Sequence, residues 1–90
     1  MKAYTGMKVQ AVDGKCIGIV IEETKWTGTI TKVNKKSIRV DLTEEVRTFG
    51  SRETSRRNPN REVRYTFWKT TSDGKEIYKS EGRIYGIIEL

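Results

Sequence analysis

Arginine is the residue type whose number and spacing in this chain are best suited to chemistry with a partner. Six arginines lie between residues 43 and 64, in a segment that has few apolar residues and contains the only proline, Pro59. A guanidinium group stays charged at all relevant pH values and binds phosphate through two parallel hydrogen bonds. The segment therefore favours phosphate recognition, although a basic segment that is merely solvated has the same composition. Its candidates for phosphate contacts are Arg52, Arg56, Arg57, Arg61 and Arg64.

Three lysines form a second group of candidates for phosphate contacts. Lys32, Lys35 and Lys36 flank Asn34, a residue type that tolerates the backbone of a tight turn. Ammonium groups on such a turn contact a phosphate backbone in some proteins and serve only solvation in others. We expect the lysine turn and the arginine segment to be two parts of one phosphate-binding surface.

Trp68 is the aromatic residue best placed to contribute to that surface. In the stretch that contains it, Val63, Tyr65 and Phe67 share one parity, which in a strand marks the buried face. Trp68 has the opposite parity and is expected to point outward. An exposed aromatic ring beside cationic side chains stacks on nucleic-acid bases, with a contribution of about 1 to 3 kcal/mol per base.

Residues for most kinds of catalysis are missing. The chain has no histidine and one cysteine, Cys16, which excludes imidazole bases, zinc sites built on histidine or on several thiolates, and an internal disulfide. Neither a GxxxxGK[ST] nor a GxGxxG phosphate loop occurs in the sequence. A nuclease site built from Asp41, Glu44 and a lysine is the remaining alternative, and no motif supports it. We expect a protein that is not an enzyme and has no catalytic, metal or cofactor site.

Composition limits the size of the core and indicates the class of partner. The chain has 90 residues, of which 34% are hydrophobic and 33% charged, so it has apolar surface for one small core. Eighteen Lys and Arg residues against twelve Asp and Glu residues give a net charge of +6, which favours a polyanionic partner such as nucleic acid. The lone cysteine, and the absence of an N-terminal signal or a long apolar run, indicate a cytoplasmic protein that does not enter a membrane.

The clearest local structure is a β-hairpin with the lysine turn at its tip. Ile38, Val40 and Leu42 alternate with polar residues, and this period of two sorts side chains onto opposite faces of a strand. Trp26 and Ile30 show the same alternation before the turn. The side chains of Ile38, Val40 and Leu42 are therefore expected to face a core.

Turn residues separate the other strands. The Asp-Gly pairs at 13–14 and 73–74 are each expected to form a tight hairpin turn. Gly18 is expected at a β-bulge or at a close backbone approach in a barrel corner, within a return strand that is covered on both faces. The charged residues 48–62 lack apolar alternation, and we expect them to form a long, exposed, Arg-rich loop.

About six short strands without a convincing helix predict one all-β domain over residues 1–90, a small antiparallel barrel. Within residues 26–42, the sequence GTITKVNKKSIRVDL resembles the turn-centred segment of SH3-like barrels of the KOW kind. This resemblance implies an SH3-like fold, and such barrels serve RNA, DNA and protein partners alike. The long Arg-rich loop departs from the compact KOW pattern, so no individual functional residue is carried over.

These features together favour a non-enzymatic module that binds DNA or RNA mainly through phosphate contacts, with modest sequence specificity. The alternative is a small regulatory or inhibitory module that binds an acidic protein surface, through the arginine segment or through an exposed sheet edge.

Overall fold

The structure is a computed structural model that describes residues 3–17 and 20–90, without the side chains of residues 15–17, 20, 57–60 and 83. Within it the strands are β1 (Lys8–Ile17), β2 (Val20–Val33), β3 (Ser37–Phe49), β4 (Arg52–Thr70), β5 (Glu76–Ser80) and β6 (Ile87–Glu89). A short 3-10 helix, η1 (Glu81–Arg83), precedes β6. Successive strands pair antiparallel, and β6 pairs with β1 through Ala11 and Val12, which closes a barrel. The predicted all-β antiparallel barrel is confirmed.

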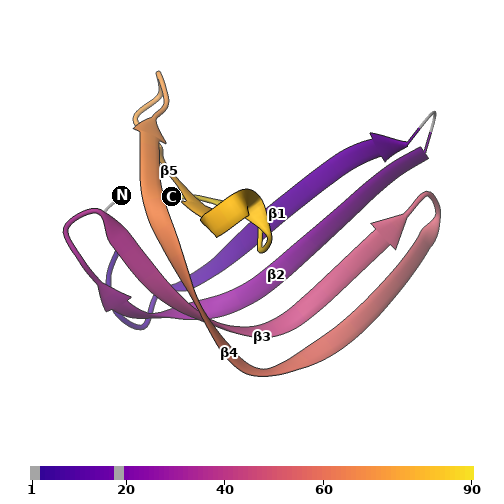
Figure 1. Ribbon diagram of the computed structural model, residues 1–90, viewed down its shortest axis with the longest axis horizontal. Helices are drawn as coiled ribbons and strands as arrows, with labels where there is room; N and C mark the ends of the chain where they lie inside the picture. Colours follow the sequence, from indigo (N-terminus) through magenta and orange to yellow (C-terminus); the bar gives the residue numbers. More distant parts are fainter. Residues whose placement is uncertain (1–2, 18–19) are drawn as a thin grey trace.

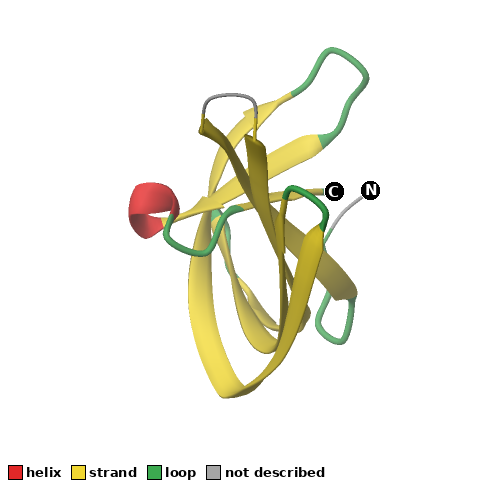
Figure 2. Ribbon diagram, turned by 90° about the vertical axis from the view of Figure 1, so that its right-hand side faces the viewer, coloured by secondary structure: helices red, strands yellow, loops and turns green. Residues whose placement is uncertain are grey.

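The first four strands reach beyond the barrel. Residues 13–17 pair with residues 20–24, and β3 and β4 extend beside them to a turn at Gly50 and Ser51. In Figure 1 these strands form a strongly curved sheet, with η1 on its concave side. Figure 2 shows η1 standing apart from the strands. We call the four-stranded extension, residues 13–25 and 43–57, the arm.

The barrel core is built from the alternating residues that the sequence marked. The structure buries Trp26 and Ile30 on β2 and the three apolar residues of β3 on the same side of the sheet. The backbone N–H of Asn34 donates to the carbonyl of Ser37 at 2.8 Å, which forms the predicted hairpin turn. The buried apolar residues are Val9, Ala11, Trp26, Ile30, Ile38, Val40, Leu42, Tyr65, Ile77, Tyr78 and Ile88.

The polar atoms of two aromatic residues in this core form hydrogen bonds within the protein. The indole N–H of Trp26 donates to Oε1 of Glu45 at 3.0 Å. The hydroxyl of Tyr65 donates to the backbone carbonyl of Tyr85 at 2.7 Å. Burial raises the pKa of Tyr65, so its hydroxyl keeps the proton that this hydrogen bond needs.

The barrel needs glycine at two positions where the backbone of another strand passes too close for a side chain. A Cβ at Gly28 would lie 2.5 Å from the carbonyl oxygen of Asp41 on the neighbouring strand. Gly86, just before β6, has a φ of +76°, and a Cβ there would lie 2.7 Å from the backbone of Val12. No other residue type fits these two positions without displacing the backbone of a neighbouring strand.

The long Arg-rich loop predicted at 48–62 is wrong. β3 continues to Phe49 and β4 starts at Arg52, so the segment is strand apart from a two-residue turn. Its side chains at 51–56, 61 and 62 are exposed, as expected. Because β4 faces solvent in the arm, it needs no apolar alternation there, and backbone pairing with β3 holds it extended.

The predictions for the other turns had mixed outcomes. The Asp-Gly pair at 73–74 does form a turn, in which Gly74 has a φ of +87°. The pair at 13–14 instead continues β1 and pairs with β2, because a longer ladder outweighs the local turn preference. Ile21 is 60% exposed, so the return strand is not covered on both faces. The bulge predicted at Gly18 lies outside the described residues.

Candidate nucleic-acid interface

The net positive charge of this protein belongs to residues outside the arm. The arm holds six basic and six acidic residues. The rest of the chain holds twelve basic and six acidic residues, and therefore carries the entire net charge of +6. A polyanion that approaches the molecule is attracted to the barrel more than to the arm.

Glutamates balance the arginines of the arm. In the register of β3 and β4, Glu45 lies opposite Arg56 and Glu44 lies opposite Arg57. Paired residues of an antiparallel ladder project from the same face, so Arg56 has an acidic neighbour beside it. Arg52, one of the predicted phosphate contacts, lies opposite Phe49 near the far turn. The phosphate-binding candidates of the arm thus stand in a region without net charge.

One outer surface of the barrel gathers cations from several strands. Lys32 on β2 pairs with Arg39 on β3, and Arg39 pairs with Arg64 on β4, so the three residues form a row across the sheet. Lys79 on β5 lies opposite Thr66, two residues along β4 from Arg64. Lys32, Arg39 and Arg64 are all exposed, and both neighbours of Arg39 on β3 are buried in the core, so the row faces solvent.

Trp68 and the lysine turn adjoin this row. Trp68 is 40% exposed, and the ammonium groups of Lys69 and Lys79 lie 4.4 and 4.7 Å from its ring centroid. The carbonyl of Lys36 accepts a hydrogen bond from the N–H of Phe67 at 2.8 Å, which holds the turn against the strand that carries Trp68. We call this surface the basic face, and it consists of Lys32, Lys35, Lys36, Arg39, Arg64, Trp68, Lys69 and Lys79.

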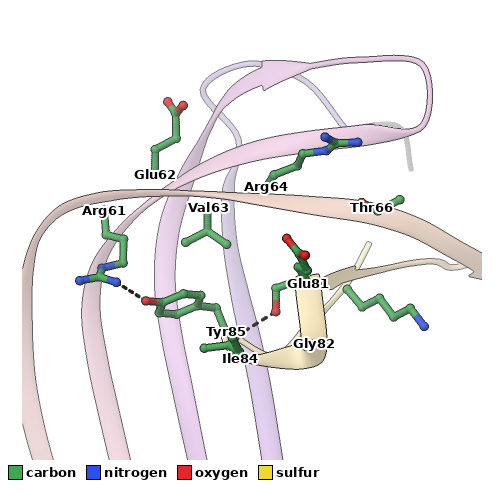
Figure 3. A pocket seen from close by; sticks show the side chains of 11 residues that line it. Arg61, Glu62, Val63, Arg64, Thr66, Glu81, Gly82, Ile84 and Tyr85 are labelled. Atoms are coloured by element: carbon green, nitrogen blue, oxygen red, sulfur yellow. Dashed lines mark hydrogen bonds between the residues drawn. The ribbon is translucent and has the colours of Figure 1, made fainter.

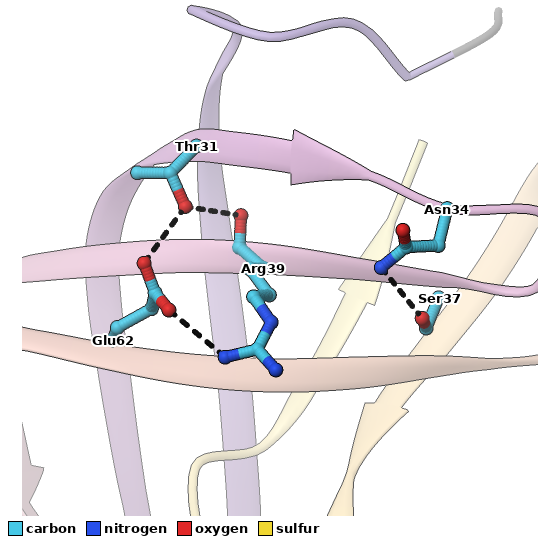
Figure 4. Close-up of polar contacts among 5 residues, drawn as sticks. All are labelled: Thr31, Asn34, Ser37, Arg39 and Glu62. Atoms are coloured by element: carbon cyan, nitrogen blue, oxygen red, sulfur yellow. Dashed lines mark hydrogen bonds and ion pairs between the residues drawn. The ribbon is translucent and has the colours of Figure 1, made fainter.

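The carboxylate of Glu62 takes part in a hydrogen-bond network on this surface (Figure 4). Glu62 accepts a hydrogen bond from Nη1 of Arg39 at 3.0 Å and another from Oγ1 of Thr31 at 3.1 Å. These bonds, that of Arg39 above all, lower the pKa of Glu62. Arg39 is therefore already paired. Among the side chains that the structure describes, no carboxylate lies within ion-pair distance of Lys32, Arg64 or Lys79.

Comparisons with protein-family models, with curated proteins and with solved structures found no match. In the described part of the chain, no group of three or more His, Cys, Asp or Glu side chains is placed to hold a metal ion. No helix among the described residues is long and apolar enough to cross a membrane.

The structure divides the predicted site residues between separate surfaces. β3 spans 13 residues between the lysine turn and the far turn of the arm, a contour of roughly 40 Å at about 3.3 Å per residue. Figure 1 shows these two ends on opposite sides of the molecule. The expectation of one phosphate-binding surface is therefore wrong. The predicted residues that do come together on the basic face are Lys32, Lys35, Lys36, Arg64 and Trp68.

Arg61 occupies a third position. Its guanidinium carbon lies 5.4 Å from the ring centroid of Tyr85, and Nη1 donates to the Tyr85 hydroxyl. Tyr85 in turn packs edge-to-face against Trp26, with ring centroids 6.0 Å apart. Arg61 is thus held in place by an aromatic ring that is anchored in the core.

Sequence reasoning missed Arg39, Lys69 and Lys79. The outward position of Arg39 was readable, because it lies between two core residues of β3. Nothing in the local sequence placed Lys79 beside Trp68, since that contact depends on the register between β4 and β5 and on a bulge between residues 67 and 69.

Proposed function

We propose that this protein binds nucleic acid through the basic face, mainly by contacts to phosphates. The observation that carries the proposal is the grouping of Lys32, Arg64 and Lys79 on one outer face of the barrel, with the half-exposed Trp68 beside Lys79. These cations belong to the part of the chain that holds the whole net charge, and none of the three forms an ion pair with a described carboxylate. Phosphate contacts of this kind supply affinity without reading sequence, so binding is expected to be weakly sequence-specific.

The barrel architecture supports the same proposal. Residues 26–42, which resemble a KOW segment, form the β2–β3 hairpin, and the lysines of its turn belong to the basic face. We propose that the barrel is SH3-like and that this hairpin is part of its binding surface.

Combined replacement of Lys32, Arg64 and Lys79 by alanine is expected to weaken nucleic-acid binding by about 10- to 100-fold at low salt, because each cation that meets a phosphate releases counterions. The slope of log affinity against log salt is expected to become shallower by about 2 to 3. Fluorescence anisotropy of labelled duplex DNA, single-stranded DNA and RNA, titrated between about 50 and 200 mM salt, measures both quantities.

The matched control removes arginines from the arm. Arg52→Ala together with Arg56→Ala deletes exposed cations from strand β4, away from the basic face, and is expected to change the affinity by less than about threefold. A large loss in this control with none in the basic-face variant would move the site to the arm. Absence of saturable binding to any of the three nucleic acids at low salt would contradict the proposal altogether.

Trp68→Leu tests whether bases are contacted as well as phosphates. Loss of a stacking platform is expected to weaken single-stranded binding by about 1 to 3 kcal/mol, because unpaired bases expose their faces. Duplex binding is expected to change less, since its bases are stacked inside the helix. The salt slope serves as the internal control and is expected to stay constant. An equal loss for duplex and single strands would show that Trp68 only orients Lys69 and Lys79.

A further inference from the structure

A row of carboxylates borders the cations of the basic face. Asp41 on β3 lies opposite Glu62 on β4, two residues along these strands from the pair of Arg39 and Arg64. Both residues that flank Asp41 on β3 are buried, so this acidic row faces outward like the row of cations. Figure 3 shows Glu62 and Arg64 on the same side of β4, away from Tyr85. Cations and carboxylates therefore form adjacent rows on one outer surface.

A groove of about 650 Å³ adjoins both rows, between β4 and the segment from the end of β5 through η1 (Figure 3). Its lining contains two carboxylates, Glu62 and Glu81, as well as the cations Arg64 and Lys79. A lining of both signs does not suit a partner that carries negative charge alone. It suits a nucleotide, whose phosphate faces the cations while the neutral hydrogen-bond donors of its sugar and base face the carboxylates.

Glu62 is the carboxylate best placed to accept a hydrogen bond from such a partner, because its side chain is 47% exposed. Among the described side chains, Arg39 donates to one of its oxygens and Thr31 to the other. A carboxylate has about four acceptor positions, so these two bonds orient the group and leave acceptor capacity on both oxygens. The bonds, that of Arg39 above all, also lower the pKa of Glu62 and keep it ionised at neutral pH. An ionised carboxylate repels a phosphate and binds an O–H or N–H donor.

Cations that bind phosphate lie close to this carboxylate. Arg64 is two residues away on β4, and the charge of Lys32 is near enough to contribute to the lowered pKa of Glu62. Within a nucleotide, the 2′ position of the sugar lies beside the 3′ phosphate. A phosphate held by Arg64 or Lys32 therefore brings a sugar toward Glu62. RNA presents an O–H donor at that position, whereas DNA presents only C–H groups.

We propose that Glu62 accepts a hydrogen bond from a ribose 2′-hydroxyl, and that the basic face therefore binds RNA in preference to DNA of the same sequence. This inference rests on the proposed function, since it needs a nucleic acid on the basic face. A hydrogen bond to an ionised group is strong, and its loss is expected to lower the affinity at least about tenfold. Phosphate contacts alone give no such preference, because both nucleic acids carry the same phosphates.

Three single strands with the same base isolate the 2′ position. They are an oligouridylate, its 2′-O-methyl derivative and an oligodeoxyuridylate. The 2′-O-methyl sugar keeps the oxygen and the RNA-like pucker but cannot donate a hydrogen bond. Fluorescence anisotropy of the labelled strands at low salt measures their affinities for the unmodified protein. The oligouridylate is expected to bind at least about tenfold tighter than each of the other two.

Glu62→Ala is expected to abolish this preference. The deoxy strand is expected to bind several-fold tighter, because a repulsive charge is removed and Arg39 is released from its ion pair. The ribose strand gains the same relief but loses its hydrogen bond, so the two affinities become nearly equal. Glu53→Ala is the matched control, since it removes an exposed glutamate from β4 in the arm and changes the net charge equally. This control is expected to keep the full preference, and both variants are expected to fold, because exposed charges contribute little to stability.

Three outcomes would overturn the inference. The first is equal affinity of the unmodified protein for all three strands; if the basic-face variants still weaken binding, the proposed function stands without a 2′-hydroxyl contact. The second is equal affinity for the oligouridylate and its 2′-O-methyl derivative, which shows that sugar conformation is recognised and not a donor. The third is an unchanged preference in Glu62→Ala, which assigns the contact to another residue. Absence of saturable binding to any strand contradicts the proposed function as well.

Discussion

Val40→Asp is expected to prevent folding, whereas Arg39→Asp is expected to fold. Val40 is fully buried in the barrel, between strands β2 and β4. An unpaired carboxylate at this position costs several kcal/mol, a large share of the roughly 5 to 15 kcal/mol that stabilise a typical domain. Far-UV circular dichroism and urea titration measure the outcome.

The neighbouring substitution is the control for this prediction. Arg39 lies on the outer face, and Arg39→Asp breaks its ion pair with Glu62 while leaving the core intact. Such exposed pairs contribute little, so only a small shift of the urea midpoint is expected. Equal tolerance of the two substitutions would contradict the assignment of inner and outer faces on β3.

Gly86→Ala is expected to destabilise the barrel by about 2 to 6 kcal/mol, the sum of backbone strain at positive φ and overpacking. The added methyl group would lie 2.7 Å from the backbone of Val12 and 3.0 Å from Cζ3 of Trp26. Neither the β1 backbone nor the buried indole can move away without opening the junction between β1 and β6. Urea denaturation followed by tryptophan fluorescence measures the loss.

Gly74→Ala separates the two contributions. Gly74 also has a positive φ, +87°, but an added Cβ there meets no heavy atom within 4 Å. Its replacement is therefore expected to cost only the conformational strain, about 1 to 3 kcal/mol. Equal losses at the two glycines would show that crowding against Val12 is unimportant.

The sequence predicted the barrel strands because each has one buried face. Burial on one side produces a period of two, as in the residues around Val40, and the period reveals both the strand and its orientation. In the arm, β4 is exposed over residues 52–56, so selection for alternation is absent and the same segment looked like a loop. Backbone pairing with β3, which is not readable from composition, makes it a strand.

The candidate site was predicted in part for a related reason. Parity placed Trp68 outward, and the lysine turn followed from local residue types. Which charged side chains become neighbours, however, depends on the register between strands. Glu45 lies opposite Arg56, whereas Lys79 lies beside Trp68. A count of arginines along the chain contains no information about register, and it therefore favoured the arm.

The closure of the barrel also has a consequence for the order of folding. Every other strand pair joins neighbours in sequence, whereas β6 and β1 are separated by most of the chain and pair only through Ala11 and Val12. Bringing such distant segments together carries the largest loop entropy for the fewest hydrogen bonds. This pairing of β1 with β6, the seam of the barrel, is therefore expected to form after the other strand pairs and to open before them. Gly86 lies at this seam, so in stopped-flow experiments Gly86→Ala is expected to accelerate unfolding and leave the folding rate nearly unchanged.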